Sequence, residues 1–155
     1  PDVAISTSVL EWREAPLPDA ATGALGLRRG ATGFSLERLR FINGLPAVYS
    51  INWLPVEVGR TLIGKPVLQG TQSLNATLRE AGFRVSQARR EVAAVIPPPE
   101  AARYLQLSKN FPALLIKSMS RDMSGQPFDY YESYARSDVV TISVDAQAVG
   151  PAEAV

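Results

Sequence analysis

The sequence predicts an α+β domain in which short helices flank a mainly antiparallel β-sheet. Residues 35–55 read as one β-hairpin, because two alternating segments flank Asn43 and Gly44, both of which tolerate a positive φ. Residues 114–136 read as a second hairpin. Each hairpin follows a short helical segment and a tight turn, and the two units lie about 80 residues apart. Four long strands in two such units favour one sheet with helices on its faces.

The chain begins with an expected strand over residues 4–13, which Pro16 and Pro18 end. Asp19 is expected to cap a short helix over residues 20–26, because its carboxylate can accept a hydrogen bond from the first free N–H groups of a helix. This helix precedes the first hairpin.

The outgoing strand of the first hairpin places two cations on a largely apolar face. The side chains that share this face by alternation are Phe34, Leu36, Arg38, Arg40 and Ile42. Two guanidiniums in such surroundings are costly unless an anion meets them. That anion is either a carboxylate of the fold, on Asp129 or Glu132 for example, or a ligand.

The middle of the chain combines an irregular stretch with a helix. Residues 56–70 are expected to be irregular, since glycines and a proline interrupt them. Residues 71–83 then predict a helix that Thr71 or Ser73 caps and Gly82 ends.

The remaining elements complete the second unit. Residues 83–96 are a strand candidate, and a run of three prolines separates it from a helix over 99–107. The second hairpin pairs strands 114–123 and 127–136. Residues 141–144 are expected to form a short last strand.

The two units also match residue by residue. Leu25 aligns with Leu105, and with one inserted residue Arg40 aligns with Arg121. Two copies are too few for a solenoid, which needs about three.

Composition excludes several classes of chemistry. The sequence has no Cys and no His, so it offers no Cys or His metal site, no thiol nucleophile and no imidazole base. We expect no catalytic residues, no metal and no cofactor. The net charge of +1 lacks the positive field typical of nucleic-acid binders. Most cations are Arg, which favours bidentate anion recognition; the codon preference of a high-GC genome explains this bias equally well.

The composition also indicates where the protein is located in the cell. No apolar run approaches the roughly 20 residues that span a bilayer, so we expect no membrane partner. The chain has no signal-peptide pattern, no Cys and no initiator Met. We expect a cytoplasmic protein that is a piece of a longer chain or a processed form.

Five motifs in order carry a resemblance to a known family. They are LGL-x-x-G, then RLR with an Asn-Gly turn and a Pro, then SLNATLREAGF, then PPPEAARYLQL, and finally SGQPFDYYESYARSD. From about residue 8 to residue 144 the chain resembles the UTRA domain of HutC-type regulators in the GntR family. The resemblance implies a chorismate-lyase-like fold, a single effector-binding domain over residues 1–155 and a homodimer. It also implies a winged helix-turn-helix that would contact DNA and is absent from this chain.

The resemblance assigns ligand contacts to several positions. The two arginines that grip a phosphate in sugar-phosphate sensors of the family correspond to Arg38 and Arg40. The serine that opens the central helix corresponds to Ser73, and the acid of the last hairpin strand corresponds to Asp129. Tyr131 shares the face of Asp129 by alternation and joins the candidate site.

Three further positions compare with the family pattern. Arg136 keeps the arginine near the end of the last strand and is a candidate ligand contact. Ser50, also a candidate ligand contact, stands where the family often has an acid, and Ala135 stands where it often has an aromatic. Both residues are smaller, which leaves room for a bulkier ligand.

We therefore expect a non-enzymatic module that binds a small, anionic effector and modulates DNA binding by the absent domain. One alternative is a chorismate-lyase-like enzyme in which an arginine and Asp129 handle the substrate. The other is a dimerisation module with a vestigial pocket.

Overall fold

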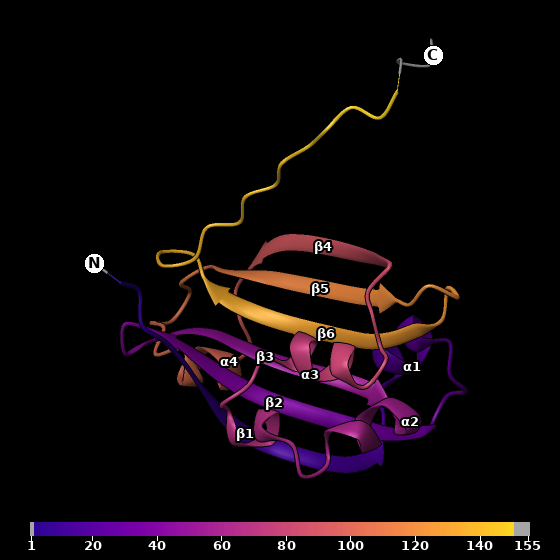
Figure 1. The fold of residues 1–155 in the computed structure, drawn as a ribbon. Coiled ribbons are helices and arrows are strands. Elements are labelled where there is room, and N and C mark those ends of the chain that lie inside the picture. The colour runs from indigo at the N-terminus through magenta and orange to yellow at the C-terminus, as the bar shows by residue number, and fades with distance from the viewer. Residues whose placement is uncertain (1, 151–155) are drawn as a thin grey trace.

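The computed structural model describes residues 2–150, and a single six-stranded sheet dominates it (Figure 1). Its strands lie in the order β1-β2-β3-β6-β5-β4, and every neighbouring pair is antiparallel. The strands are β1 (Ile5–Pro16), β2 (Thr32–Ile42), β3 (Leu45–Pro55), β4 (Gln87–Val95), β5 (Ala113–Arg121) and β6 (Pro127–Arg136). The expected α+β class and both hairpins are confirmed.

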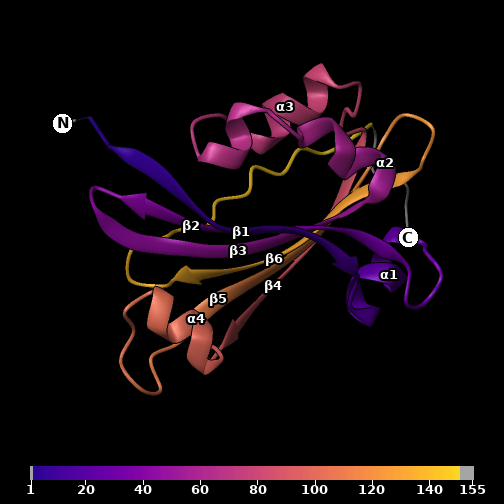
Figure 2. The same cartoon turned by 90° about the horizontal axis from the view of Figure 1, so that it is seen from below.

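Short helices cover both faces of the sheet. The face that we call upper carries α2 (Val56–Gly59) and α3 (Leu74–Glu80), together with the 3-10 turns η1 (Arg60–Leu62) and η2 (Pro66–Gln69). The lower face carries α1 (Asp19–Leu25) and α4 (Pro99–Tyr104), as the edge-on view of Figure 2 shows. No helix among residues 2–150 is long and apolar enough to cross a bilayer.

The strand alternation divides the core between the two faces. Phe34 and Leu36 of β2 point upward and pack with Leu78 of α3 in the main apolar cluster. Leu39, of the opposite parity, points downward and packs with Leu105 beyond the end of α4. The cations that follow Leu36 in the upward parity therefore lie at the border of the upper cluster, and this placement forms the site.

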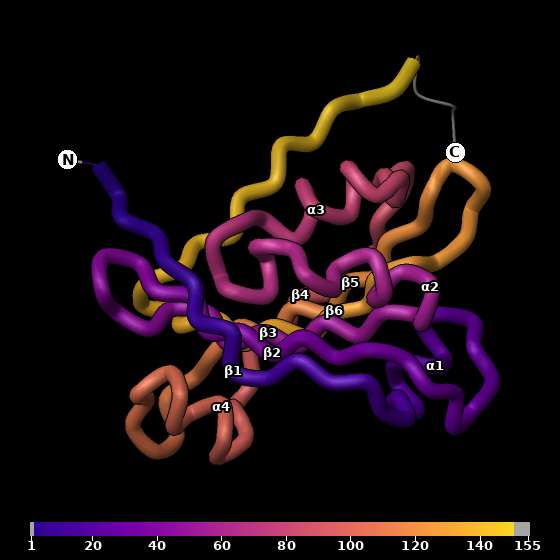
Figure 3. Tube along the Cα trace, turned by 60° about the horizontal axis from the view of Figure 1, so that its bottom comes forward, coloured from indigo at the N-terminus to yellow at the C-terminus, as the bar shows by residue number. Residues whose placement is uncertain are grey.

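The sequence repeat corresponds to two similar halves of the sheet. Strands β1, β2 and β3 form one half, β4, β5 and β6 form the other, and the halves meet where β3 pairs with β6. The segments after α1 and α4 have left-handed residues at matching places. Gly26 corresponds to Gln106, and Gly30 corresponds to Asn110. The trace in Figure 3 shows α1 and α4 on the same side of this sheet.

The structure corrects one detail of the repeat. Phe41 lies opposite Pro46 in the first hairpin, and Arg121 lies opposite Pro127 in the second. Arg121 is therefore the counterpart of Phe41 rather than of Arg40. The residue inserted in the second unit lies in its hairpin turn, between Arg121 and Pro127, and not before Arg121.

One of the two expected helix caps is present in the structure, and the other is not. Ser73 caps α3, because its hydroxyl accepts the Ala76 N–H at 3.3 Å. Asp19 does not cap α1: Pro18 occupies that position without a side-chain bond, and Asp19 lies in the first turn. Its carboxylate instead pairs with Arg29 at 2.9 Å, so the acid still faces the positive end of the helix.

Two other expectations are wrong. Residues 56–70 are not irregular, because Val58, Leu62 and Val67 are each at most 2% exposed and draw α2, η1 and η2 onto the upper cluster. Residues 141–144 form no strand and pair with no part of the described chain.

Candidate functional site

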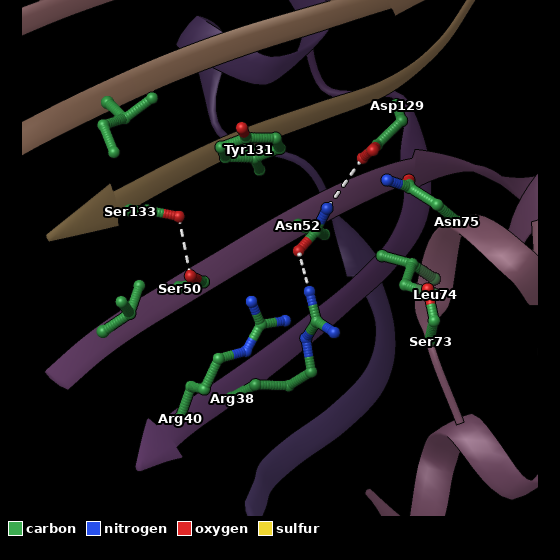
Figure 4. A pocket seen from close by; sticks show the side chains of 12 residues that line it. Arg38, Arg40, Ser50, Asn52, Ser73, Leu74, Asn75, Asp129, Tyr131 and Ser133 are labelled. Carbon is green, nitrogen blue, oxygen red and sulfur yellow. Dashed lines mark hydrogen bonds between the residues drawn. The ribbon is translucent and has the colours of Figure 1, made fainter. Parts of the chain in front are cut away.

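A cavity of about 270 Å³ opens on the upper face, between strands β2, β3 and β6 and the start of α3 (Figure 4). Polar side chains dominate its lining. The residues that line it are Arg38, Arg40, Val48, Ser50, Asn52, Ser73, Leu74, Asn75, Ile116, Asp129, Tyr131 and Ser133. Six of the seven residues that the sequence selected are in this set, and Arg136 is the exception.

Strand geometry brings these residues together. Residues of one parity on β2, β3 and β6 point into the cavity, so each strand contributes two or three side chains. On β6 a β-bulge adds a residue, since Ser120 lies opposite Asp129 while Arg121 lies opposite Pro127. The extra residue, Phe128, joins the upper core and Asp129 joins the cavity, so both serve the same face.

Arg38 lies at the inner end of the cavity and makes one side-chain bond there. Its Nη2 donates to Asn52 Oδ1 at 3.1 Å, while its Nε is buried without a hydrogen-bond partner. Burial, and then the neighbouring charge of Arg40, lower the pKa of Arg38 to about 10. The guanidinium is therefore charged at neutral pH, incompletely bonded and next to open space.

Arg40 lies beside Arg38 and nearer the solvent. It is exposed, and Figure 4 shows its guanidinium next to that of Arg38, directed toward the same space. Among residues 2–150 neither arginine forms an ion pair. In the described chain, therefore, no carboxylate of the fold neutralises either arginine through an ion pair.

Asp129 faces the arginines across an amide. Asn52 Nδ2 donates to Asp129 Oδ1 at 2.9 Å, so Asn52 separates the carboxylate from Arg38. Asp129 is 4% exposed. Burial raises its pKa to about 6, while the Asn52 bond and the charge of Arg38 act in the opposite direction.

Hydroxyls on β3 and β6 line the cavity beside the arginines. Ser50 and Ser133 lie opposite each other on β3 and β6, and their Oγ atoms are 2.6 Å apart. Tyr131 adds a phenol ring from β6, and Val48 and Ile116 supply apolar surface. The cavity thus combines the two cations of β2 with hydroxyl, phenol and apolar groups and with the Asp129 carboxyl.

The comparisons with known proteins decide the family. The family model described as the UTRA domain matches residues 2–141. The chain belongs to the UTRA domain family.

Curated relatives of this UTRA domain are transcriptional regulators. The HTH-type transcriptional regulator GgaR of Escherichia coli K12 is 25% identical over 122 residues, which cover 79% of this chain and 47% of that protein. The chain spans about half the length of the curated relatives it matches. These relatives do not favour the chorismate-lyase-like enzyme.

Solved structures share the fold. The effector domain of PhnF from Mycobacterium smegmatis has a TM-score of 0.85 at 20% identity, over 94% of this chain and 89% of that one. A GntR-family transcriptional regulator from Enterococcus faecalis V583 has a TM-score of 0.81 at 18% identity, over 91% of this chain and all of that one. At these identities the likeness shows the fold alone.

Arg136 lies away from the cavity of this UTRA domain, unlike the other six candidate residues. Its guanidinium makes two bonds to Asp138, at 3.0 and 2.8 Å, and a third to the Leu105 carbonyl at 3.2 Å. The bonds to Asp138 raise the pKa of Arg136 and lower that of Asp138. Arg136 has the parity of Tyr130 and Tyr134, which face α1 and α4. It ties the end of β6 to the end of α4.

The sequence missed three polar residues of the cavity. Asn52 and Ser133 share the parity of Ser50 and Asp129 on their strands, so alternation alone could have found them. Asn75 follows the helix cap, and no local signal points to it. Ala135 is fully buried and is not among the lining residues. The residues described contain no cluster of acids suited to hold a metal ion.

Proposed function

We propose that this UTRA domain senses a small anionic effector and modulates DNA binding by a winged helix-turn-helix domain outside the chain. The observation that carries the proposal is the pair formed by Arg38 and Arg40, which lies in a cavity without ion-pair partners among residues 2–150. Clustered cations in such a place favour a phosphate or carboxylate, which each guanidinium can bind through two N–H groups. The regulator would act as a homodimer in the cytoplasm.

The effector would reach across the cavity to polar groups on other elements. Arg38 and Arg40 would hold its anion, and Asp129, Tyr131, Ser50 and the neighbouring Ser133 would bind the remainder. Arg136, held by Asp138 outside the cavity, has no part in this proposal.

The start of α3 offers a route from the ligand to the rest of the regulator. Ser73 and Asn75 line the cavity and follow the helical segment 56–70 directly. A ligand that contacts both β2 and Ser73 would favour the arrangement in which this segment closes on the sheet. The effect on DNA binding would equal the difference in ligand affinity between the two arrangements.

Thermal-shift measurements with phosphorylated and carboxylated metabolites test the proposal. Arg40→Ala is the sharper variant, because Arg40 is exposed and its loss leaves the core intact. We expect anionic ligands that stabilise the wild type to bind Arg38→Ala and Arg40→Ala about 10- to 100-fold more weakly, in line with about 1.5–3 kcal/mol for a hydrogen bond to a charged group.

Arg29→Ala is the matched control, since it removes an exposed arginine outside the cavity. Equal stabilisation of the wild type and both cavity variants by every anion would contradict the assignment of the anion site. A panel that stabilises no form of the protein would favour the vestigial pocket instead.

A further inference from the structure

A second cavity, of about 350 Å³, lies on the lower face of the sheet beside the start of α1. Strands β1, β2 and β3 contribute to its lining, and Leu17 and Pro18, which lead into α1, add an apolar wall. Its residues on β2 and β3 have the opposite parity to those that line the cavity of the arginine pair. The two cavities therefore lie on opposite faces of the same strands and share no residue.

A small residue in a cross-strand row leaves this lower-face cavity open. Arg13 lies opposite Ser35, and Ser35 lies opposite Trp53. The serine side chain is too short to fill the space beside the indole. Arg13 is 63% exposed and pairs with Glu11, with Nε and Oε1 3.3 Å apart. These two charges neutralise each other, so the pair adds no net charge to the cavity.

Trp53 gives the cavity an aromatic wall. It lies opposite Tyr130 on β6, and the two rings stack with their centroids 5.7 Å apart. Tyr130 does not line the cavity, so the indole stands between the phenol ring and the open space. Tryptophan attracts cations more strongly than the other aromatic residues do, and a guanidinium can stack flat on its ring.

Glu37 supplies the net charge of the cavity. It lies opposite Ile51, two residues before Trp53 on β3, so it is the diagonal neighbour of the indole. The Cβ atoms of such neighbours are about 7–8 Å apart, within reach of one bound group. Tyr49 donates its hydroxyl to Glu37 Oε1, which positions the carboxylate and leaves other lone pairs free. Among residues 2–150 no cation forms an ion pair with Glu37.

We propose that the lower-face cavity is a second binding site, which takes a guanidinium group between the Trp53 ring and the Glu37 carboxylate. A planar cation suits this place, because it can stack on the indole and donate two parallel N–H bonds to the carboxylate. An ammonium group is compact and strongly hydrated, so it gains less from the ring. The guanidinium comes from a free metabolite or from an arginine of a protein chain. The proposal does not depend on the anionic effector, because the two cavities have no lining residue in common.

NMR titration with two matched cations tests the site. Propylguanidine is the arginine side chain alone, and propylamine differs from it only in the charged group. The Trp53 indole N–H signal reports where the ligand binds. Trp12, the other tryptophan of the chain, packs against the upper cluster, so its signal is an internal reference. Ligand-observed NMR gives the affinity of each variant.

Three variants separate this cavity from other acidic places on the surface. Glu37→Gln removes the charge and keeps an acceptor for Tyr49, while Trp53→Leu removes the ring. Glu57→Gln is the matched control, since it removes an exposed acid from α2 on the upper face. Circular dichroism checks the fold of Trp53→Leu, which loses the stack on Tyr130, and Glu37→Gln tests the site without that loss.

We expect propylguanidine to shift the Trp53 signal at millimolar concentration and to bind more tightly than propylamine does. Glu37→Gln should weaken its binding about tenfold, since a hydrogen bond to a charged group is replaced by one to a neutral group. Trp53→Leu should weaken it about 2- to 30-fold through loss of the cation–π contact. Glu57→Gln should bind like the wild type.

No shift of the Trp53 signal, or equal affinity of the wild type and both cavity variants, overturns the proposal. Equal affinity for propylamine and propylguanidine overturns the assignment to a guanidinium. An acetylated Gly-Arg-Gly amide distinguishes the two sources. If it binds more tightly than propylguanidine, this supports an arginine of a protein chain, and if it binds more weakly, this supports a free metabolite.

Discussion

At the scale of single residues, an amide replaces the ion pair that a buried acid and a buried base usually form. Asn52 accepts from Arg38 and donates to Asp129, so the two charges are near each other but not in contact. Direct contact with a guanidinium lowers the pKa of a carboxyl by one unit or more, roughly. Here burial has the larger effect, and the pKa of Asp129 lies at about 6. The charged carboxylate therefore destabilises the folded domain at neutral pH.

This arrangement predicts an unusual dependence of stability on pH. The pKa of Asp129 is raised from 3.8 to about 6, so the folded chain binds the proton more tightly than the unfolded chain. The free energy of unfolding should therefore fall as pH rises from about 4 to 6, by about 2–3 kcal/mol. Asp129→Asn resembles the protonated form. It should remove this fall and be more stable than the wild type at pH 8 by about 1–3 kcal/mol.

Urea unfolding between pH 4 and pH 8 measures both effects. Asp145→Asn, on the unpaired tail, controls for the loss of one negative charge. If the wild type and Asp129→Asn lose stability in parallel across this window, burial does not raise the pKa of Asp129.

The alternation of side chains along β-strands explains how much of the site the sequence could predict. It placed Arg38 and Arg40 together, and applied to β3 and β6 it would have added Asn52 and Ser133. The same rule argued against Arg136, whose parity is that of Tyr134. Asn75 lay beyond prediction, because its position depends on how α3 packs across the sheet.

At the scale of elements, local signals predicted the strands and turns better than the connections. Asn43 and Gly44 adopt the positive φ values, 50° and 79°, that the predicted hairpin turn requires. The glycines of residues 56–70 read as irregular, yet buried apolar residues between them fold the segment onto the core. The strand expected at 141–144 has the right pattern, but the described chain offers it no neighbour. The alternation of apolar and polar residues indicates the conformation that a segment prefers. Its neighbours in the fold decide whether it adopts that conformation.

Gly70 and Gly64 give a matched test of how the segment between β3 and α3 is attached. Both have positive φ, 79° and 76°. A Cβ at Gly70 would lie 2.3 Å from the Thr7 carbonyl oxygen, while a Cβ at Gly64 would meet nothing within 4 Å. We expect Gly64→Ala to cost about 1–2 kcal/mol from the backbone alone. Gly70→Ala should cost about 1–3 kcal/mol more, since η2 must move away from β1.

Urea unfolding of the two variants under identical conditions measures the difference. Equal losses would mean that the approach of Gly70 to β1 contributes nothing to stability.

At the scale of the whole molecule, the two halves are joined by more than the β3–β6 pair. Helix α1 of the first half packs on β6 of the second, and α4 of the second half packs on β3 of the first. Leu25 accordingly contacts a cluster that contains Tyr130, and Leu105 contacts one that contains Tyr49. The repeat visible in the sequence predicted the two halves, but not this crossing of their helices.

Crossed packing predicts that the halves unfold together. Leu25 and Leu105 are fully buried, so Leu25→Ala and Leu105→Ala should each cost about 2–5 kcal/mol. Each variant should keep a single transition, with the same midpoint by circular dichroism and by tryptophan fluorescence. Leu45→Ala, at a site that is 37% exposed, should change the midpoint little. Separate midpoints for the two probes would show that one half unfolds before the other.

The same crossing constrains how the chain is made. During synthesis β3 emerges from the ribosome more than 70 residues before the end of β6, with which it must pair. Until then the nascent first half has neither its neighbouring strand nor the helix that covers its lower cluster, and it remains open to chaperones and to other nascent chains. Completion of the fold therefore waits for translation to pass residue 136, and the candidate cavity, which needs β6, is among the last features to form.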